Sequence, residues 1–390
     1  MAKSYFTLLL VGLLYILGEC EAQAPLAPAL YVFGDSTVDV GNNNMLKTLA
    51  KANYAPYGVD FPGGVNGRPT NGKNMADFIA SKLGINSPPA YRLVDLKTYT
   101  STQGFNYASS SAGILPETGF VRNINYHIIL AIISIILSNY NLYLIIYLQK
   151  DILTMDQQVG LFKTTVGEYL PTHLPNPISV SDHLSKSIFM FVVGSNDYGL
   201  TFLGKHNGTA EESDFDAFAT SLLDRYAFQL EAIYNLGARK FVVFDIEPTG
   251  CVPAQVQKFK PQNSKCVDDY NAMVSSYNAM LPNKLQELQS KLQGSTFILV
   301  KHYNFMLNLV QKPACFGLKE VASPCCPVTP LGICDAKRPP CPDRNSFAFF
   351  DAFHPTEAVY KALAETCFSG NHLCVPNIQQ LATLSFHTTT

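Results

Sequence analysis

Short runs of consecutive apolar residues recur along the chain, and each ends at a cluster of small or polar residues. Runs of this length that are rich in Val, Ile, Phe and Tyr are typical of strands buried on both faces. They occupy residues 29–34, 104–108, 187–193, 240–246 and 295–300. The first run stops at Gly34-Asp35-Ser36, a trio of turn-forming residues.

Helical patterns fill much of the sequence between these runs. We expect helices over residues 74–83, 217–234, 270–292 and 357–366. Thr356 precedes the last of them and is a residue type suited to an N-cap. Apolar strands that alternate with helices indicate an α/β fold in which a parallel sheet is covered on both faces. No internal repeat or linker divides the chain, so residues 25–390 are interpreted as one domain.

Three loops next to the predicted strands have unusual compositions. Residues 36–44 are rich in Asn and Gly, which predicts a tight turn with left-handed backbone. Residues 53–74 are rich in Pro, Gly and Asn and predict a long surface loop that rims a substrate cleft. Residues 109–113 are small, so that the backbone there can approach a ligand closely.

Residues 121–150 differ from the rest of the chain. The segment is crowded with Ile, Leu, Tyr and Asn and contains no Gly, Pro, Asp or Glu. It has no clean amphipathic period, and polar residues at 138–141 interrupt it as a membrane span. We interpret it as an anomalous insertion that represents a translated intron, and a genuine hydrophobic helical insertion is the alternative.

The N-terminal residues predict a secretory signal peptide. Lys3 supplies a positive charge, residues 6–17 form an apolar core, and small residues follow at Ala22 and Ala24. This order of features is typical of a cleaved signal, here residues 1–24. The alternative is a membrane anchor, for which the apolar run is short. We therefore expect a secreted protein, extracellular or in the cell wall, without a stable membrane span.

Composition supports a large globular core and argues against a nucleic-acid partner. Hydrophobic residues make up 47% of the 390 residues, charged residues make up 15%, and the net charge is −2. A protein that binds nucleic acid usually carries a basic surface, which this charge balance does not provide. The sequon Asn207-Gly208-Thr209 is a candidate N-glycosylation site and fits a secreted protein.

The cysteines also fit an oxidising compartment. Of the ten, Cys20 lies in the predicted signal peptide, and the other nine lie in the C-terminal part of the chain. We expect most of them to form disulfides, with at least one left over because the number is odd. Zinc binding by the cluster 315–341 is a competing interpretation, which the irregular spacing disfavours.

Residues suited to acyl transfer stand at the ends of the predicted strands and in the last loop. Ser36 follows the first strand, where open α/β sheets place their ligands. Asp351 and His354 are three residues apart in a predicted turn, so that the carboxylate can orient the imidazole. His302, after the fifth run, is the second candidate for the base. Taken singly, Ser36 also fits an N-cap and Asp351-x-x-His354 also fits a turn at a helix entry.

Three groups are candidates for stabilising an oxyanion. They are the Ser36 N–H, a backbone N–H in the loop 109–113, and the side-chain amide of Asn196 at the end of the third strand. Asn196 alone also fits an ordinary turn. Four sets of polar candidates nevertheless stand at strand ends or in the last loop, and one shared site explains them better than four unrelated turns.

Several ordered motifs resemble the plant GDSL esterase/lipases, a family of the SGNH hydrolases. The motifs are Phe33-Gly34-Asp35-Ser36 with Asp39 and Gly41-Asn42-Asn43, Gly194-Ser195-Asn196-Asp197, and Asp351-Ala352-Phe353-His354-Pro355. Residues 57–64, 236–243 and 248–253 extend the similarity, which spans nearly the whole mature chain except 121–150. The Gly-x-Ser-x-Gly motif of α/β-hydrolases is not found.

The resemblance implies a flavodoxin-like three-layer α/β/α sandwich with a parallel sheet of about five strands. It also implies that Ser36 is the nucleophile, His354 the base and Asp351 the residue that orients His354. Ser36, Gly113 and Asn196 would hold the oxyanion, and no metal or cofactor would be required. This sequence departs from the family where Ser109-Ser110-Ser111 stand in place of glycine-rich residues.

Together these observations predict a secreted serine esterase that hydrolyses carboxylic esters, with a small-molecule or lipid ester as substrate. An acyltransferase with the same acyl-enzyme is one alternative, because an alcohol can replace water in the second step. A secreted binding protein that keeps the fold without activity is the other. The sequence leaves the acyl chain, the alcohol and the oligomeric state open.

Overall fold

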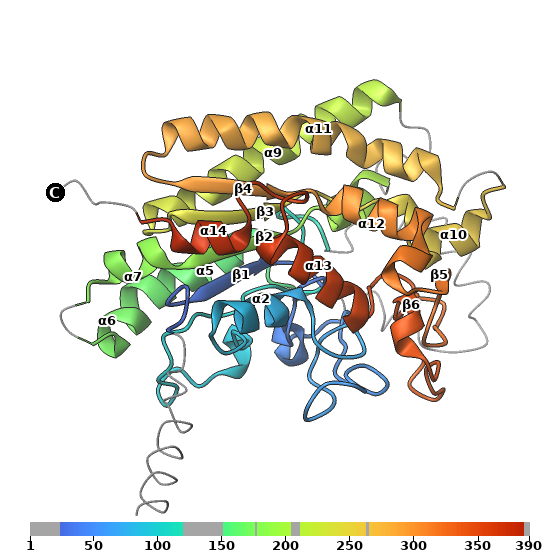
Figure 1. The fold of residues 1–390 in the computed structure, drawn as a ribbon, viewed down its shortest axis with the longest axis horizontal. Coiled ribbons are helices and arrows are strands. Elements are labelled where there is room, and N and C mark those ends of the chain that lie inside the picture. Colours follow the sequence, from blue (N-terminus) through green and yellow to red (C-terminus); the bar gives the residue numbers. More distant parts are fainter. Residues whose placement is uncertain (1–23, 120–150, 176–177, 204–210, 263–264, 386–390) are drawn as a thin grey trace, which may run out of the picture.

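A four-stranded parallel sheet forms the centre of the protein, whose computed structural model describes residues 24–119, 151–175, 178–203, 211–262 and 265–385. The strands are β1 (Leu30–Gly34), β2 (Ile188–Val192), β3 (Lys240–Phe244) and β4 (Thr296–Val300), which lie side by side in this order. Every residue of β1, β2 and β3 is buried, which explains why these strands are apolar without alternation. Figure 1 shows the sheet between its covering helices.

The predicted strand over residues 104–108 is only partly formed. The segment runs parallel to β1, where Phe105 O accepts the Val32 N–H at 3.1 Å and Val32 O accepts the Tyr107 N–H at 2.8 Å. On its other side the segment contacts residues 89–91, where the Asn106 N–H donates to Pro89 O and the Asn106 oxygen accepts the Tyr91 N–H, both at 2.9 Å. The sheet thus has four strands where about five were expected. With this segment counted as an edge, the chain order is 2-1-3-4-5, as in flavodoxin-like sheets.

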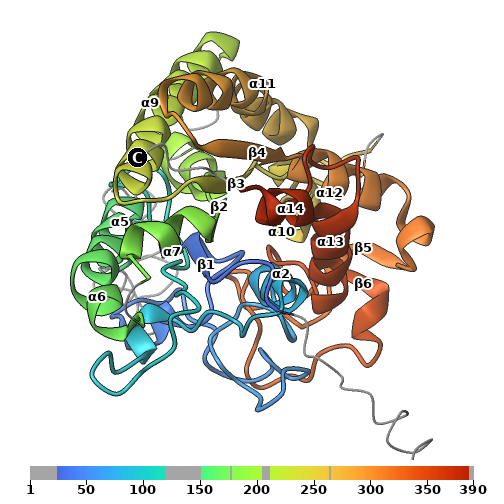
Figure 2. The same ribbon diagram turned by 60° about the vertical axis from the view of Figure 1, so that its left-hand side comes forward.

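Helices cover both faces of the sheet and complete three layers (Figure 2). On one face lie α2 (Met75–Leu83), α12 (His302–Gln311), α13 (Glu357–Ser369) and α14 (Ile378–Thr383). On the other lie α5 (Met155–Thr164), α6 (Leu170–His173), α7 (Val180–Lys186), α9 (Glu212–Asn235) and α11 (Asp268–Lys291). Alternate residues of each strand point to opposite layers, and Phe33 stacks on Phe191 at 4.9 Å.

Local sequence explains where one of the predicted helices begins, whereas a distant loop caps another. Asn74 caps α2 through a capping box with Asp77, in which each side chain bonds the other residue's N–H. Thr356 occupies the N-cap position of α13, but its hydroxyl donates to Phe347 O and not to the helix. The carboxamide oxygen of Asn71 accepts the Glu357 N–H at 2.9 Å. The predicted cap is therefore supplied by a loop distant in sequence.

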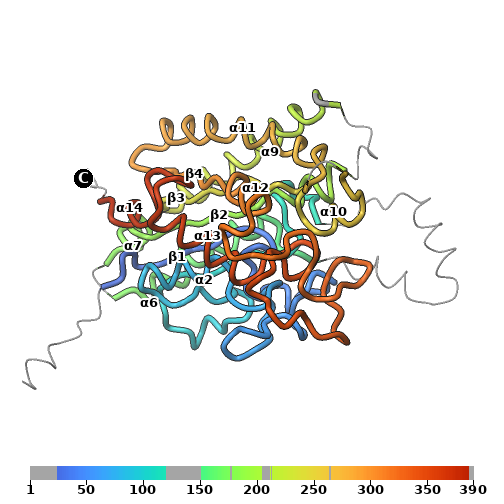
Figure 3. The backbone as a smooth tube through the Cα atoms, turned by 45° about the vertical axis from the view of Figure 1, so that its right-hand side comes forward, coloured from blue at the N-terminus to red at the C-terminus, as the bar shows by residue number. Residues whose placement is uncertain are grey.

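A smaller unit carries the last loop of the chain. It consists of α10 (Pro253–Phe259) and a two-stranded parallel sheet of β5 (Glu320–Pro324) and β6 (Phe347–Phe349). Single turns complete the fold: the 3-10 helices Asn42–Met45, Tyr91–Leu93, Thr249–Cys251, Pro313–Phe316 and Arg344–Ser346, and the π-helical turns Thr165–Tyr169 and Asp197–Phe202. Figure 3 shows this unit beside the loop that follows β1.

The cysteines mostly pair, as expected. The disulfides are Cys251–Cys266, Cys325–Cys341 and Cys326–Cys334. Four of the five cysteines in the cluster 315–341 are thus engaged in disulfides, so the zinc interpretation of that cluster is wrong. Cys315 is an exposed thiol, whereas the thiols of Cys367 and Cys374 are buried.

Several expectations fall on residues that are not described. The signal peptide up to residue 23, the insertion 121–150 and the sequon at Asn207 all lie outside the described residues. Among the helices that are described, none is both long enough and apolar enough to cross a membrane.

Candidate active site

Ser36 lies in the turn that follows β1, at the carboxyl edge of the sheet. Gly34, the last residue of β1, has φ +150°, and a Cβ atom there would lie 2.1 Å from Val192 O. Only glycine therefore lets β1 approach β2 this closely at its end. Beyond it, Asp35 O accepts the Asp39 N–H at 3.0 Å, which closes the turn around a half-buried Ser36.

The structure brings Ser36 to His354 and Asp351, although the serine is more than 300 residues from both in sequence. His354 Nε2 lies 2.8 Å from Ser36 Oγ, and His354 Nδ1 lies 2.8 and 2.9 Å from the two oxygens of Asp351. Asp351 is fully buried and also accepts the backbone N–H groups of Phe353 and His354. The carboxylate therefore fixes the imidazole through Nδ1, and the other ring nitrogen, Nε2, faces the Ser36 hydroxyl.

A fourth side chain completes the surroundings of Asp351. The Tyr57 hydroxyl donates to Asp351 Oδ2 at 2.6 Å and accepts the Cys334 N–H at 3.1 Å. Tyr57 begins the motif over residues 57–64, and the motif indicates no role for its hydroxyl. Its partner is 294 positions away, and no local pattern in the sequence indicates such a contact.

The charges around His354 raise its pKa. Burial disfavours the imidazolium, but the Asp351 carboxylate outweighs this effect with help from Asp35 and Glu247, and the pKa of His354 lies above its ordinary value. Asp35 is itself fully buried, and desolvation together with the charge of Glu247 raises its pKa to about 7. The site therefore stabilises positive charge on His354.

His302, the second candidate for the base, is placed elsewhere. It opens α12, is buried at 2% exposure, and its Nδ1 lies 3.9 Å from Glu247 Oε2. Neither ring nitrogen has a hydrogen-bond partner among the described residues, and burial lowers the pKa of His302. The structure places His354, and not His302, against Ser36.

Asn196 and Gly113 lie on neighbouring segments joined by hydrogen bonds. Asn196 Nδ2 donates to Ala112 O at 2.9 Å. The next residue, Asp197, accepts the Ile114 N–H at 2.8 Å and the Leu115 N–H at 2.9 Å, so that its carboxylate holds the loop just beyond Gly113.

Gly113 itself has no room for a side chain. A Cβ atom there would lie 2.4 Å from Thr118 Cγ2 and 2.6 Å from both carboxylate oxygens of Asp197. Within the described residues, no acceptor is bonded to the backbone N–H of Gly113 or of Ser36.

The serines that depart from the family pattern are built into the same loop. Ser110 donates both its N–H and its hydroxyl to Asp39 Oδ2, at 3.0 and 2.9 Å. The Ser109 hydroxyl donates to Asn43 Oδ1 at 2.5 Å and accepts the Leu153 N–H at 3.0 Å. These serines therefore join the loop 109–113 to the Asp39–Asn43 turn.

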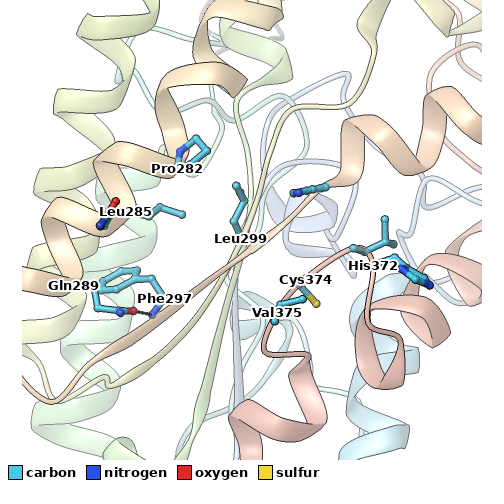
Figure 4. Close-up of a pocket in the computed structure, with 11 residues that line it drawn as sticks. Pro282, Leu285, Gln289, Phe297, Leu299, His372, Cys374 and Val375 are labelled. Carbon is cyan, nitrogen blue, oxygen red and sulfur yellow. Dashed lines mark hydrogen bonds between the residues drawn. The ribbon is translucent and has the colours of Figure 1, made fainter.

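The loop 53–74 packs against the turn that carries His354. The Thr70 hydroxyl donates to Pro355 O at 2.8 Å, and Asp60 pairs with Arg344. A cavity of about 330 Å³ lies between this loop and residues 336–340. A second cavity, of about 320 Å³, lies between α11, β4 and the loop with His372 and Cys374 (Figure 4), and no residue of the Ser36 site lines it.

Metal-ligating side chains do not gather in the part of the chain that is described: it contains no group of three or more His, Cys, Asp or Glu side chains that could hold a metal ion. The serine, histidine and aspartate at the carboxyl edge of an α/β/α sandwich define a class, the SGNH-type hydrolases.

Comparison with known proteins gives the family. The chain belongs to the GDSL-like lipase/acylhydrolase family, whose sequence profile matches residues 30–366. Among curated Arabidopsis thaliana proteins, GDSL esterase/lipase At1g71691 is 34% identical over 367 residues, covering 92% of this chain and 87% of the relative. GDSL esterase/lipase 7 is 34% identical over 374 residues, covering 94% and 95%. The expected resemblance and fold class are confirmed, and the protein is a carboxylic ester hydrolase.

Proposed function

We propose that the protein hydrolyses esters through an acyl-enzyme on Ser36, with His354 as general base and acid and Asp351 as its orienting partner. The observation that carries this proposal is the continuous contact from Asp351 through His354 to Ser36 Oγ at 2.8 Å. A serine hydroxyl is a weak nucleophile unless a base accepts its proton, and this geometry provides the base.

In the first step, Ser36 Oγ attacks the ester carbonyl carbon while its proton passes to His354 Nε2. The N–H groups of Ser36 and Gly113 and the amide of Asn196 stabilise the negative oxygen that forms. The intermediate collapses as the bond to the alcohol oxygen breaks, and His354 protonates that alcohol. Water then gives a proton to His354, attacks the acyl carbon and releases the acid with regeneration of Ser36.

Active-site labelling with a fluorophosphonate tests the nucleophile directly. We expect one label, located on Ser36 by peptide mass spectrometry, and hydrolysis of a short soluble ester. His354→Ala should lose both label and hydrolysis by at least about 1000-fold, whereas Ser81→Ala, on the exposed side of α2, should keep both. A folded wild-type protein that takes no label and hydrolyses no ester would contradict the proposal and favour a binding protein.

We also propose that the enzyme is secreted, with residues 1–24 removed and Asn207 glycosylated. Three disulfides among the described cysteines support this, since disulfides persist in oxidising compartments. Expression in a eukaryotic secretory host followed by N-terminal sequencing tests the cleavage. A mature N-terminus near residue 25 and a mass that falls on treatment with an N-glycosidase are expected, and retention of residues 1–24 would contradict cleavage.

A further inference from the structure

A buried glutamine holds the end of β1 next to the nucleophile. Gln158, on α5, has no exposed side-chain surface and makes two bonds to the backbone of a single residue, Gly34. Its Oε1 accepts the Gly34 N–H at 2.8 Å, and its Nε2 donates to Gly34 O at 2.8 Å. Gly34 is two residues before Ser36, and neither motif nor periodicity in the sequence singled out Gln158.

The backbone of β1 explains why a side chain is needed at this place. Along its outer edge, β1 bonds to the partly formed strand, with Leu30 N–H donating to Gln103 O and Val32 N–H donating to Phe105 O. The same spacing would bring the Gly34 N–H to residue 107. Gln158 Oε1 accepts this N–H instead, so the carboxamide supplies the acceptor that the partly formed strand does not supply at Gly34.

Gln158 also joins the nucleophile turn to the loop that carries Gly113. Its Nε2 donates to Leu153 O at 2.9 Å, and the Leu153 N–H donates to Ser109 Oγ. The Gly34 oxygen accepts the Ser109 N–H at 3.0 Å as well. A single carboxamide therefore fixes Gly34 relative to both α5 and the start of the oxyanion loop.

We propose that Gln158 is a positioning residue that sets the turn of Ser36 relative to His354 and to the oxyanion donors. This inference rests on the proposed function of Ser36. Gln158 touches neither the hydroxyl nor His354, and it acts only through the Gly34 peptide groups. Displacements of the nucleophile by about 1 Å cost rate and not substrate affinity, and losses of about 100-fold are known for such shifts.

The first experiment compares Gln158→Met with Tyr31→Phe. Met is close to Gln in length but cannot bond to Gly34, and Tyr31→Phe removes another buried hydrogen bond of β1, that to His183. We expect Gln158→Met to lower kcat and the rate of fluorophosphonate inactivation by about 10- to 100-fold in parallel, with KM changed less than about twofold. Tyr31→Phe should change kcat by less than about threefold at a comparable loss of thermal stability.

The inference is overturned if Gln158→Met, at a similar melting temperature, loses no more activity than Tyr31→Phe. It is also overturned if the whole loss is in KM. The wild-type protein separates this from failure of the proposed function: without label or hydrolysis in the wild type the proposal of the acyl-enzyme fails, whereas full activity in Gln158→Met contradicts only the role of Gln158.

Gln158→Glu provides a second test that does not depend on the folding of the Met variant. A carboxylate can accept the Gly34 N–H but cannot donate to Gly34 O, whereas the protonated carboxyl can do both. Burial raises the pKa of a carboxyl at such a site. The activity of this variant relative to wild type should therefore rise severalfold between pH 8 and pH 6, and a ratio that is constant or falls would overturn the inference.

Discussion

Four hydrogen-bond donors contact the carboxylate of Asp351. Two are backbone N–H groups of its own turn, one is His354 Nδ1, and one is the Tyr57 hydroxyl. A buried carboxylate with this many donors is held in one orientation. Tyr57 is hydrogen-bonded in turn to Cys334, which forms the disulfide with Cys326. The segment closed by this disulfide therefore supports the orientation of His354 through Tyr57 and Asp351.

Tyr57→Phe should lower kcat by roughly tenfold with little change in KM. The variant removes the 2.6 Å bond to Asp351, and bonds to charged groups contribute about 1.5–3 kcal/mol. Steady-state kinetics with a soluble ester measures the effect. Tyr54→Phe is the matched control, since the Tyr54 hydroxyl donates to Cys334 O and makes no bond to Asp351. Equal losses of kcat in the two variants would show that contact with the Cys326–Cys334 segment, and not the bond to Asp351, is what the reaction requires.

The raised pKa of His354 has a consequence for the pH profile of kcat/KM. The base must be neutral to accept the Ser36 proton, so activity falls as pH decreases through the pKa of His354. Asp351 and Asp35 stabilise the imidazolium, and the acid limb should therefore lie above pH 6.5, the ordinary value for histidine.

Asp35→Asn should move this acid limb to lower pH by less than about one unit, because it removes a negative charge that favours the imidazolium, although the Asp35 carboxyl, with its own pKa of about 7, carries that charge only in part at the acid limb. The carboxamide oxygen of Asn can still accept the Thr37 N–H that Asp35 accepts at 2.9 Å. Profiles of kcat/KM from pH 5 to pH 9 measure the shift, and Asp95→Asn, at an exposed position, should leave the limb in place. A shift to higher pH would contradict the assignment of His354 as base.

At the scale of elements, the site is assembled by the ends of strands and the loops beyond them. Ser36 follows β1, Asn196 follows β2, and His354 precedes α13. Loops are held by buried polar side chains, as when Asp197 accepts the Ile114 and Leu115 N–H groups. Parallel strands place these ends at one edge of the sheet, so separate segments of the chain contribute one side chain each.

The flanks of the segment 120–150 meet in space. A Cβ atom on Gly119 would lie 2.6 Å from Ile152 Cδ1, and Leu153 is already bonded to Ser109. Residues on both sides of the segment thus belong to one packed loop, and few residues are needed to join them. This is the arrangement expected if residues 121–150 are a translated intron, a hypothesis that sequencing of the transcript tests.

Deletion of residues 121–150 should leave the fold and the esterase activity intact, with a melting temperature equal to or above that of the full chain. Thermal unfolding and ester hydrolysis check this. A deletion extended to 115–155 is the control and should unfold the protein, because it removes Ile152 and Met155 from buried positions. Loss of folding in the shorter deletion would support a genuine structural insertion.

At the scale of the whole molecule, two buried thiols lie close together in the helical layer that contains α13 and α14. Cys367 ends α13 and Cys374 lies in the loop before α14, beside the cavity in Figure 4. The two thiols are hydrogen-bonded to each other, and Cys374 Sγ also lies 3.3 Å from Cys367 O. In an oxidising compartment, disulfide exchange with a small-molecule disulfide such as oxidised glutathione would join them, with release of two thiols.

We therefore expect the protein, when produced in an oxidising compartment, to contain a fourth disulfide, Cys367–Cys374, and one free thiol, Cys315. Alkylation of the denatured, unreduced protein followed by peptide mapping should label Cys315 alone, and Cys315→Ser should abolish the labelling. The oxidised protein should also melt at a higher temperature than Cys367→Ser with Cys374→Ser. Labels on Cys367 and Cys374 in the unreduced protein would contradict the pairing.

The sequence by itself determined most of the elements and marked Ser36, Asn196 and His354 as candidates for the reacting groups. Strands buried on both faces need continuous apolar runs, so four of the five predicted strands formed where expected. The motifs that follow two of these strands carry Ser36 and Asn196, and the motif before the helix at 357–366 carries His354. Local turns such as the Asp351 turn hold these residues, and such turns can be recognised in the sequence. The predicted strand at 104–108 formed only in part: it bonds to β1 through Val32, but the Gly34 N–H bonds to Gln158, a distant partner that local propensity does not report.

Only the tertiary structure decided which side chains support those groups. Tyr57 meets Asp351 across 294 positions, Gln158 meets Gly34 across 124, and Asn71 caps a helix 286 residues later. Each of these contacts satisfies a buried polar group whose partner depends on how distant segments pack. A sequence pattern reports only on residues that are a few positions apart. The packing of the sheet brings distant segments of the chain to one edge, and the contacts made there could not be found before the fold was known.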